Sequence, residues 1–339
     1  MSNRGFRPLL TTEISLSLWF FYLLFKAQYI VAYSLGFMPA SLPTSIGWAG
    51  IKPATFLGYQ QMGAYLVYVF SLLWMARAHL KHIARRAFGR AKATREERGE
   101  ALSYPLAFWG FLGSFTFLLI WSVAAGIRLD IAFAMWFFYV VCAIALSRVV
   151  IESGLLYVQQ GFTPLGTFAQ LFGSGSGAWL SQRSLVPAGF VQLNMMIDLR
   201  ANLLPSFLHS FKLAQDRRIA PKPLLSLIFA AVVVAYGAGI YQAVRMGYNG
   251  GGIGFNGWVV RGSPQQAASM SQQLGQGVAG SELSNWGWMA CGGLLTYGVM
   301  AARACFSWFP LHPIGLLLCL THPMFMLWFS FFLGWGPKF

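Results

Sequence analysis

Charged residues are scarce in this chain of 339 residues, at 10% of the total, whereas soluble domains carry roughly 25%. Acidic residues are the scarcest, because 9 Asp and Glu stand against 24 Lys and Arg. Apolar residues make up 57% of the chain, and the mean hydropathy is +0.57. These values exclude an ordinary water-soluble domain and indicate a polytopic membrane protein in contact with a lipid bilayer.

Cysteine is also rare, and the usual motifs of catalysis are missing. The four cysteines lack CxxC spacing, so we expect neither a disulfide framework nor a metal site. The histidines form no pair with ligand spacing, and His312, which precedes Pro313, is interpreted as the start of the last helix. No nucleotide-binding or GxSxG motif occurs in a strand–turn–helix context. We therefore expect no metal, no cofactor and no enzymatic activity.

Long apolar runs dominate what is present. Each of seven segments is near the roughly 20 residues that a helix needs to cross a bilayer. The sequence therefore predicts an all-α polytopic membrane domain over residues 1–339, with about seven transmembrane helices and an interfacial or re-entrant segment. The expected spans are 14–37, 58–78, 104–126, 129–150, 223–246, 285–304 and 313–335.

The distribution of basic residues predicts the orientation of these spans. The loop 79–103 is rich in Lys and Arg, which places it in the cytoplasm under the positive-inside rule. The N-terminal tail 1–13 and the segment 151–222 are then cytoplasmic, and the Gly-rich loop 247–284 is external, between the fifth and sixth of the spans. The same rule explains the net charge of +15 without a nucleic-acid partner, so none is expected.

The segment 151–222 is expected to hold more than a simple loop. Its part 154–172 is apolar but interrupted by Gly161, Pro164 and Gly166, which leaves a surface loop or a re-entrant piece open. We favour at least one re-entrant or interfacial helix here. Between 203 and 214, apolar residues recur at helical spacing beside basic ones, which predicts an amphipathic helix on the cytoplasmic interface.

The first span contains the most informative polar residues, because Lys26 and Gln28 interrupt its apolar run near the middle. An ammonium at that depth costs about 2.5–3.5 kcal/mol or more, so such residues are functional candidates. The lysine is also the centre of a polar and aromatic stripe at three- or four-residue spacing, which a helix places on one face. This Lys26 stripe consists of Ser15, Trp19, Tyr22, Lys26, Tyr29 and Tyr33.

Two interpretations of Lys26 are open. In the functional one, the lysine binds an anionic group of a substrate or gives up its proton on burial, and Gln28, Tyr22, Tyr29 and Tyr33 are its neighbours in the site. In the structural one, Lys26 pairs with a carboxylate or with helix-end carbonyl groups inside the bundle. The two interpretations differ in whether the ammonium of Lys26 is paired with a counter-ion inside the protein.

Arg148 and Glu152 form a second candidate, at the cytoplasmic end of the fourth span. Their spacing of four residues puts them on one helix face, where a local ion pair contributes about 0.2–0.5 kcal/mol. The alternative makes Glu152 a site for a coupling ion or a proton beside Gly154, where the helix ends. The local ion pair is the simpler interpretation.

Several stretches together resemble a known family: Trp19–Gln28, Leu102–Tyr104, Arg148–Gly154, Phe211–Ala214, Leu311–Gly315 and Leu327–Leu333. The family comprises large, uncharacterised bacterial membrane proteins built from two adjoining domains of unknown function, and it is distantly similar to the oligopeptide transporter superfamily. The resemblance runs from about Thr12 to Gly334 and implies a polytopic fold in the bacterial inner membrane and, more remotely, solute transport. The chain resembles the later part of the family pattern, which suggests a fragment or a shortened subunit.

The leading hypothesis is therefore a transporter-like protein that moves a small anionic or zwitterionic solute and uses Lys26, with Glu152 in support. The alternative is a non-catalytic structural or assembly subunit of a larger membrane complex, for which the partner would be another membrane protein or a missing N-terminal half. A high aromatic content, 17%, favours this alternative.

Overall fold

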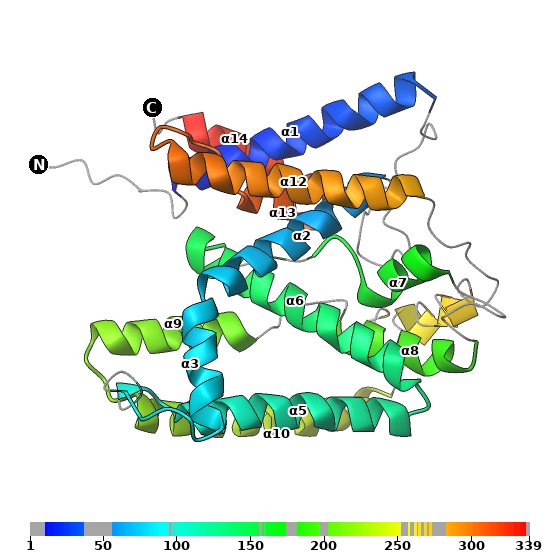
Figure 1. Cartoon of the computed structure of the whole chain (residues 1–339). Helices are drawn as coiled ribbons and strands as arrows, with labels where there is room; N and C mark the ends of the chain where they lie inside the picture. The colour runs from blue at the N-terminus through cyan, green and yellow to red at the C-terminus, as the bar shows by residue number, and fades with distance from the viewer. Residues whose placement is uncertain are drawn as a thin grey trace, which may run out of the picture.

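The computed structural model is all-helical over the residues that it describes, with no strand among them (Figure 1). The all-α expectation is confirmed at this level. The described residues are 11–36, 56–94, 97, 99–155, 158, 160–173, 182–196, 203–251, 257, 261–262, 264–265, 268–269, 271–272 and 283–336. Residues 1–10 of the expected N-terminal tail and most of the Gly-rich loop 247–284 lie outside them.

The N-terminal and C-terminal helices pack together in one group. α1 (Thr12–Ser34) contacts α13 (Ile314–Leu318) and α14 (His322–Trp335), and α2 (Phe56–Met75) packs along α12 (Leu283–Cys305). Figure 1 shows α1, α12 and α14 as neighbouring blue, orange and red helices. Segments that are about 300 residues apart in the sequence therefore build one core.

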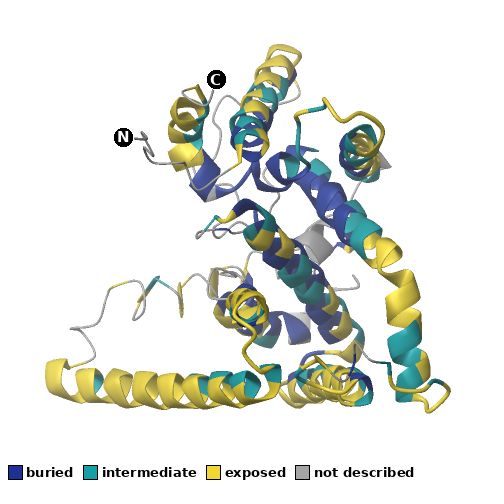
Figure 2. Ribbon diagram, turned by 90° about the vertical axis from the view of Figure 1, so that its left-hand side faces the viewer, coloured by how far each residue is buried: buried dark blue, intermediate teal, exposed yellow. Residues whose placement is uncertain are grey.

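α6 (Leu129–Ser153) links this group to the rest of the protein. It contacts α2 on one side, and on the others α5 (Tyr104–Ala124), α7 (Pro164–Phe172), α8 (Gln182–Met195) and α9 (Leu203–Asp216). Another long helix, α10 (Pro221–Gly250), contacts α9 and has no buried residue. Figure 2 shows α10 as the long, largely exposed helix along the lower edge.

Among the described residues, four helices are long and apolar enough to cross a membrane, so the expected seven spans are not confirmed. They are α1, α5, α6 and α10. α2 and α12 have 20 and 23 residues, but their sequences include Gln, Asn, Ser and several Gly, and they are not among these four. The expected span 313–335 is divided into α13 and α14, which are too short to cross singly.

Proline explains why the last segment is divided. Pro323 lies in the first turn of α14, and inside a continuous helix its ring would clash with the carbonyl group four residues earlier, so a new helix begins there. Thr321, immediately before α14, is extended, with φ −84° and ψ 151°. The break at 319–321 is buried, since Cys319, Leu320 and Thr321 are each no more than 8% exposed. A buried break in a membrane helix leaves backbone groups that need partners inside the protein.

α2 and α12 approach each other closely through glycine. A Cβ atom added at Gly63 would lie 1.8 Å from the carbonyl oxygen of Met289, and one at Gly292 would lie 2.0 Å from the carbonyl oxygen of Gln60. Small residues allow this backbone contact between membrane helices, where dispersion forces drive association. This close contact with α12 therefore fixes the position of α2 in the bundle.

The non-helical segment before α7 is buried. Residues 160–166 and Val158 are all shielded from solvent, and α7 itself has 9 residues, fewer than a span needs. This arrangement fits the expected re-entrant or interfacial helix, and its depth in a membrane stays a prediction. The amphipathic helix expected near 203–214 corresponds to α9, where Leu204 and Leu208 are exposed.

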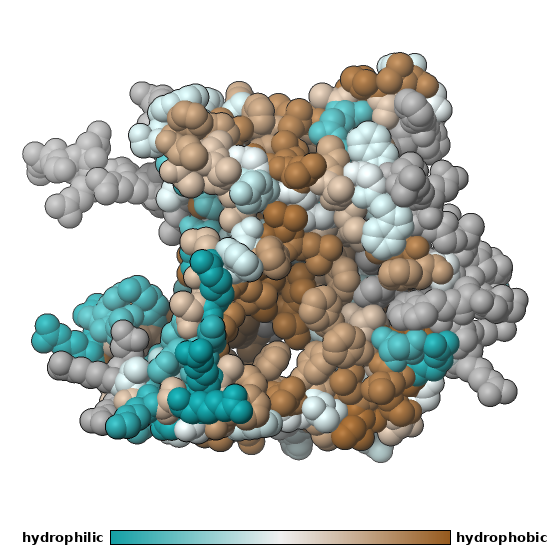
Figure 3. All heavy atoms as spheres, viewed as in Figure 1, coloured by the Kyte–Doolittle hydropathy of each residue, from teal (hydrophilic) through white to brown (hydrophobic). Residues whose placement is uncertain are grey.

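A basic helix, α3 (Arg77–Ala87), runs across the end of α5 and has no buried residue. Figure 3 shows hydrophilic atoms gathered along it beside a hydrophobic surface. Glu97 connects α3 to α5. This buried carboxylate pairs with Arg86 at 3.1 Å and accepts a hydrogen bond from the backbone N–H of Tyr104 at 3.2 Å. One side chain thus joins the end of α3 to the start of α5.

Replacing Glu97 by alanine is expected to loosen α3 from α5. The change leaves the buried N–H of Tyr104 without its acceptor, which costs about 1–3 kcal/mol locally, and it releases Arg86. Trypsin should then cut the Arg-rich segment 85–98 several times faster in detergent-solubilised protein. Glu100→Ala is the control, because Glu100 is exposed and accepts from the Tyr104 hydroxyl alone among the described residues. Equal cleavage rates in the two variants would contradict this role of Glu97.

Candidate functional site

The Lys26 stripe packs against α14. Its first four members all contact α14, so the side chains that helical spacing placed on one face do contact protein. Ser15 Oγ donates to the Phe331 carbonyl at 3.0 Å, the Trp19 ring is 5.2 Å from Phe332 and 5.3 Å from Trp335, Tyr22 stacks on Trp328 at 5.5 Å, and Lys26 lies over Phe325 at 5.6 Å.

Lys26 is held by aromatic rings. Its Nζ lies 5.5 Å from the ring centre of Tyr22 and 5.6 Å from that of Phe325, and its side chain is partly exposed. Such cation–π contacts contribute about 0.5–2 kcal/mol each. Among the residues that the structure describes, no carboxylate lies within ion-pair distance of Lys26. The first form of the structural interpretation, a pair of Lys26 with a carboxylate, therefore finds no support in this part of the chain, and the pairing with helix-end carbonyl groups stays a prediction.

The remaining candidates in the first span do not share this environment. Tyr33 is 50% exposed, and Tyr29 packs on the hydrophobic cluster around Phe25. Gln28 lines a small cavity of about 20 Å³ with Gln60 and Gln61. The structure thus brings Lys26 and Tyr22 together and places Gln28 in a separate pocket, which has no charged side chain among its described lining residues.

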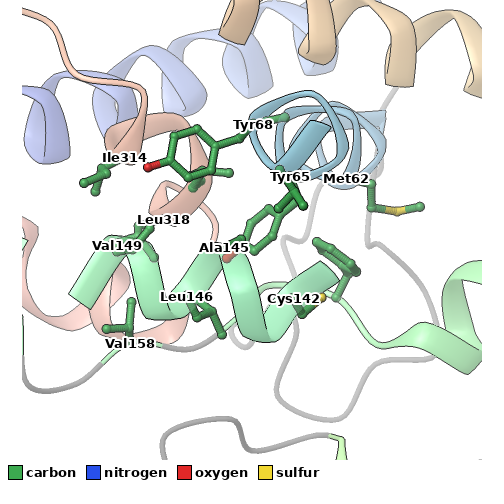
Figure 4. Packing of buried hydrophobic residues seen from close by; sticks show 14 of the residues in the cluster. Met62, Tyr65, Tyr68, Cys142, Ala145, Leu146, Val149, Val158, Ile314 and Leu318 are labelled. Carbon is green, nitrogen blue, oxygen red and sulfur yellow. The ribbon is translucent and has the colours of Figure 1, made fainter. Parts of the chain in front are cut away.

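Glu152 is the centre of a second arrangement. Its Oε1 pairs with Arg148 Nη2 at 2.5 Å, so the expected local ion pair is present. Its Oε2 accepts a hydrogen bond from the Tyr68 hydroxyl at 3.0 Å and lies 3.8 Å from His312 Nε2. Figure 4 shows Tyr68 reaching from α2 toward Val149 of α6 and Ile314 of α13. Glu152 therefore joins α2 and the segment before α13 to its own helix.

The backbone around His312 is fixed from α1 and α12. The His312 N–H donates to Ser17 Oγ at 2.6 Å, and this hydroxyl donates to the Glu13 carbonyl, also at 2.6 Å. Arg303 Nη1 pairs with the Glu13 carboxylate at 2.8 Å and donates to the Leu311 carbonyl at 3.4 Å. We call the whole set the Glu152 cluster; it consists of Glu13, Ser17, Tyr68, Arg148, Glu152, Arg303 and His312.

The Glu152 cluster gathers helix ends that the positive-inside rule assigns to the same side. The start of α1 and the ends of α6 and α12 meet in it, as the predicted topology requires. Which side of the membrane this is stays a prediction. Sequence reasoning identified Arg148 and Glu152 and missed the other five members: Glu13, Ser17, Tyr68, Arg303 and His312. A signal was available, since Glu13 and Arg303 are opposite charges at span ends assigned to one side.

The described residues contain no group of three or more His, Cys, Asp or Glu side chains that could hold a metal ion. Two of the four cysteines, Cys142 and Cys319, are buried, and each of the four is a free thiol. His79 and His82 each lie edge-on to the ring of Tyr104.

Four long apolar helices in an all-helical fold define an integral membrane protein. The chain belongs to a family of unknown function, DUF6785, because the family model matches residues 5–339. The expectation of an uncharacterised family is confirmed. No curated protein and no solved structure matches the chain. The distant similarity to oligopeptide transporters and the bacterial origin stay predictions.

Proposed function

We propose that this protein moves a small anionic or zwitterionic solute across a membrane and that Lys26 binds the negative group of the solute. The observation that carries the proposal is the position of Lys26: its ammonium lies over Phe325, in the first turn of α14, and has no carboxylate partner among the described residues. A free cation beside a helix start is a favourable place for an anion, because the helix dipole puts partial positive charge there.

The divided last segment supports transport. Many transporters place their binding sites at discontinuous membrane helices, where half-helix ends face the solute. α13 and α14 form such a pair, and their break packs against α1, which carries Lys26. Counted with α2, α12 and this divided segment, the four apolar helices would give seven crossings. The proposed location is the bacterial inner membrane, with the N-terminus in the cytoplasm.

Lys26→Met is expected to abolish uptake while the protein stays folded. The reason is that a charge-assisted contact contributes about 1.5–3 kcal/mol, which corresponds to about 10- to 100-fold in affinity. Purified protein would be reconstituted in vesicles and tested with a panel of labelled amino acids, carboxylates and short peptides. Lys26→Arg should retain part of the activity.

Lys212→Met is the matched control, because it removes a lysine that is 68% exposed and paired with Asp216 on α9. It should transport like the wild type. Two outcomes would overturn the proposal: wild-type vesicles that take up nothing across the panel, or a Lys26→Met variant that transports as well as the wild type.

One observation favours the second function, a subunit of a larger membrane complex. α10 extends over 30 residues without one buried residue, so most of its surface beyond the contact with α9 is available to lipid or to a partner. Mild-detergent purification from native membranes would test this. A stoichiometric partner that crosslinks to α10 would favour the subunit, and a chain that purifies alone would favour transport.

A further inference from the structure

We infer that His312 and Glu152 form a proton-binding site and that the proton controls the start of α13. The inference names a coupling ion for the proposed function, and its transport consequence rests on that function. The proton site itself rests on the geometry of the Glu152 cluster. Nothing in the local ion pair of Arg148 and Glu152 requires a histidine, so the presence of His312 beside this carboxylate needs an account of its own.

The hydrogen bonds of His312 define its tautomer. The backbone N–H of Ile314 donates to His312 Nδ1 at 3.2 Å, so Nδ1 is an acceptor and carries no proton. In the neutral ring the proton is then on Nε2, and this nitrogen is the one that faces Glu152 Oε2 at 3.8 Å. A second proton can enter only at Nδ1.

Charged and titratable groups face His312 from each helix packed around it: Glu13 from α1, Tyr68 from α2, Arg148 and Glu152 from α6, and Arg303 from α12. The two carboxylates and the two arginines balance in charge. Burial lowers the pKa of His312 to about 4, with Arg303 acting in the same direction and Glu152 against it. The ring is therefore neutral at pH 7 and gains a proton on acidification.

Proton uptake changes two contacts at once. A proton on Nδ1 removes the acceptor of the Ile314 N–H, and Ile314 is the first residue of α13. The charged ring is at the same time attracted to Glu152 across the 3.8 Å gap. Protonation thus pulls the side chain toward α6 while it frees the start of α13, which leads into the buried break and then to α14 beside Lys26.

A proton suits this cluster better than a metal ion. Each of its carboxylates already pairs with an arginine, at 2.5 Å for Glu152 and at 2.8 Å for Glu13. A sodium ion would have to displace a guanidinium to gain oxygen ligands. A proton needs a nitrogen lone pair, which His312 supplies, and the proton comes from and returns to water at the end of the bundle.

The first test needs no solute. The pKa of His312 in the folded protein is lower than the ordinary value of about 6.5, so the unfolded chain binds more protons below that pH. The contribution of neutral His312 to stability is therefore complete above about pH 6.5 and is lost as the pH falls toward 4. His312→Asn keeps an acceptor at the position of Nδ1 but does not titrate. Its unfolding temperature in detergent should fall less on acidification than that of the wild type.

His312→Gln provides the contrast, because its amide lies at the position of Nε2 and leaves the Ile314 N–H without an acceptor. This variant should be less stable than His312→Asn at every pH. Identical stability curves for wild type and His312→Asn between pH 4 and 6.5 would overturn the proton site, whatever the transport assays show.

The second test uses vesicles. Uptake by the wild type should depend on pH, and uptake by His312→Asn should not. Glu152→Gln should move the midpoint of the pH profile to lower pH, because it removes a charge that raises the pKa of His312. Arg303→Gln should move it to higher pH, by about one unit in either case. Shifts of the midpoint in the same direction for both variants would contradict the proton site. Vesicles without any uptake would contradict the proposed transport, and the stability test would then decide whether His312 binds the proton.

Discussion

Replacing Gly292 by alanine is expected to lower the free energy of unfolding by about 1–3 kcal/mol or more, because it overfills the α2–α12 contact. The new Cβ would lie 2.0 Å from the carbonyl oxygen and 2.5 Å from the carbonyl carbon of Gln60. These are backbone atoms within a helix, so the strain can be relieved only if the two helices move apart. Unfolding of the detergent-solubilised protein by heat or by denaturant would measure the loss.

Gly298→Ala is the matched control on the same helix. A Cβ atom at Gly298 meets nothing within 4 Å among the described atoms, and alanine is the better helix former by about 1 kcal/mol. This variant should therefore be as stable as the wild type or slightly more stable. If both alanine variants lost stability equally, the close contact at Gly292 would not be the cause.

The α2–α12 contact matters for the candidate site because α2 connects its parts. Gln61 Nε2 on α2 donates to the Leu317 carbonyl of α13 at 2.7 Å, and Tyr68, two turns further along, donates to Glu152. A shift of α2 away from α12 would alter both contacts. Gly292→Ala protein that is still folded should thus show weaker uptake as well as lower stability.

The sequence predicted local features of the site and missed its long-range pairs. Helical spacing placed Ser15, Trp19, Tyr22 and Lys26 on one face, because a helix repeats every 3.6 residues whatever surrounds it. It also placed Arg148 beside Glu152. Spacing says nothing about which helix packs opposite, so the contact of Lys26 with Phe325 could not be derived in this way.

The count of seven spans is not confirmed, for a related reason. Hydropathy averages over a window, so it merged α13 and α14 into one run although Pro323 marks a helix start inside it. In α2 the polar residues are used within the protein, as Gln61 is with α13, so apolar character does not identify a helix that other helices cover. The pairing of Tyr68 with Glu152, 84 residues apart, depends on such packing.

Trp136→Ala is expected to be the most destabilising single change outside the candidate site, by about 3–5 kcal/mol. The Trp136 side chain is buried in a hydrophobic cluster with Ile131, Leu165 and Leu185. Its Nε1 donates a hydrogen bond to Ser122 Oγ at 2.9 Å. Ser122 and Tyr104 are the buried residues of α5. The variant therefore loses a large ring from the core and also the hydrogen bond that fixes α5 on α6.

Phe137→Ala tests whether burial, rather than aromatic content, causes the effect. Phe137 is the next residue on α6, but its side chain is 48% exposed and its recorded ring contacts are with Phe133 and Phe138 of the same helix. Its loss should cost less than about 1 kcal/mol, in the range of surface substitutions. Equal losses in the two variants would mean that the face of α6 turned to α5 is wrongly assigned. The contact between α5 and α6 would then need a different register, in which Ser122 has another partner.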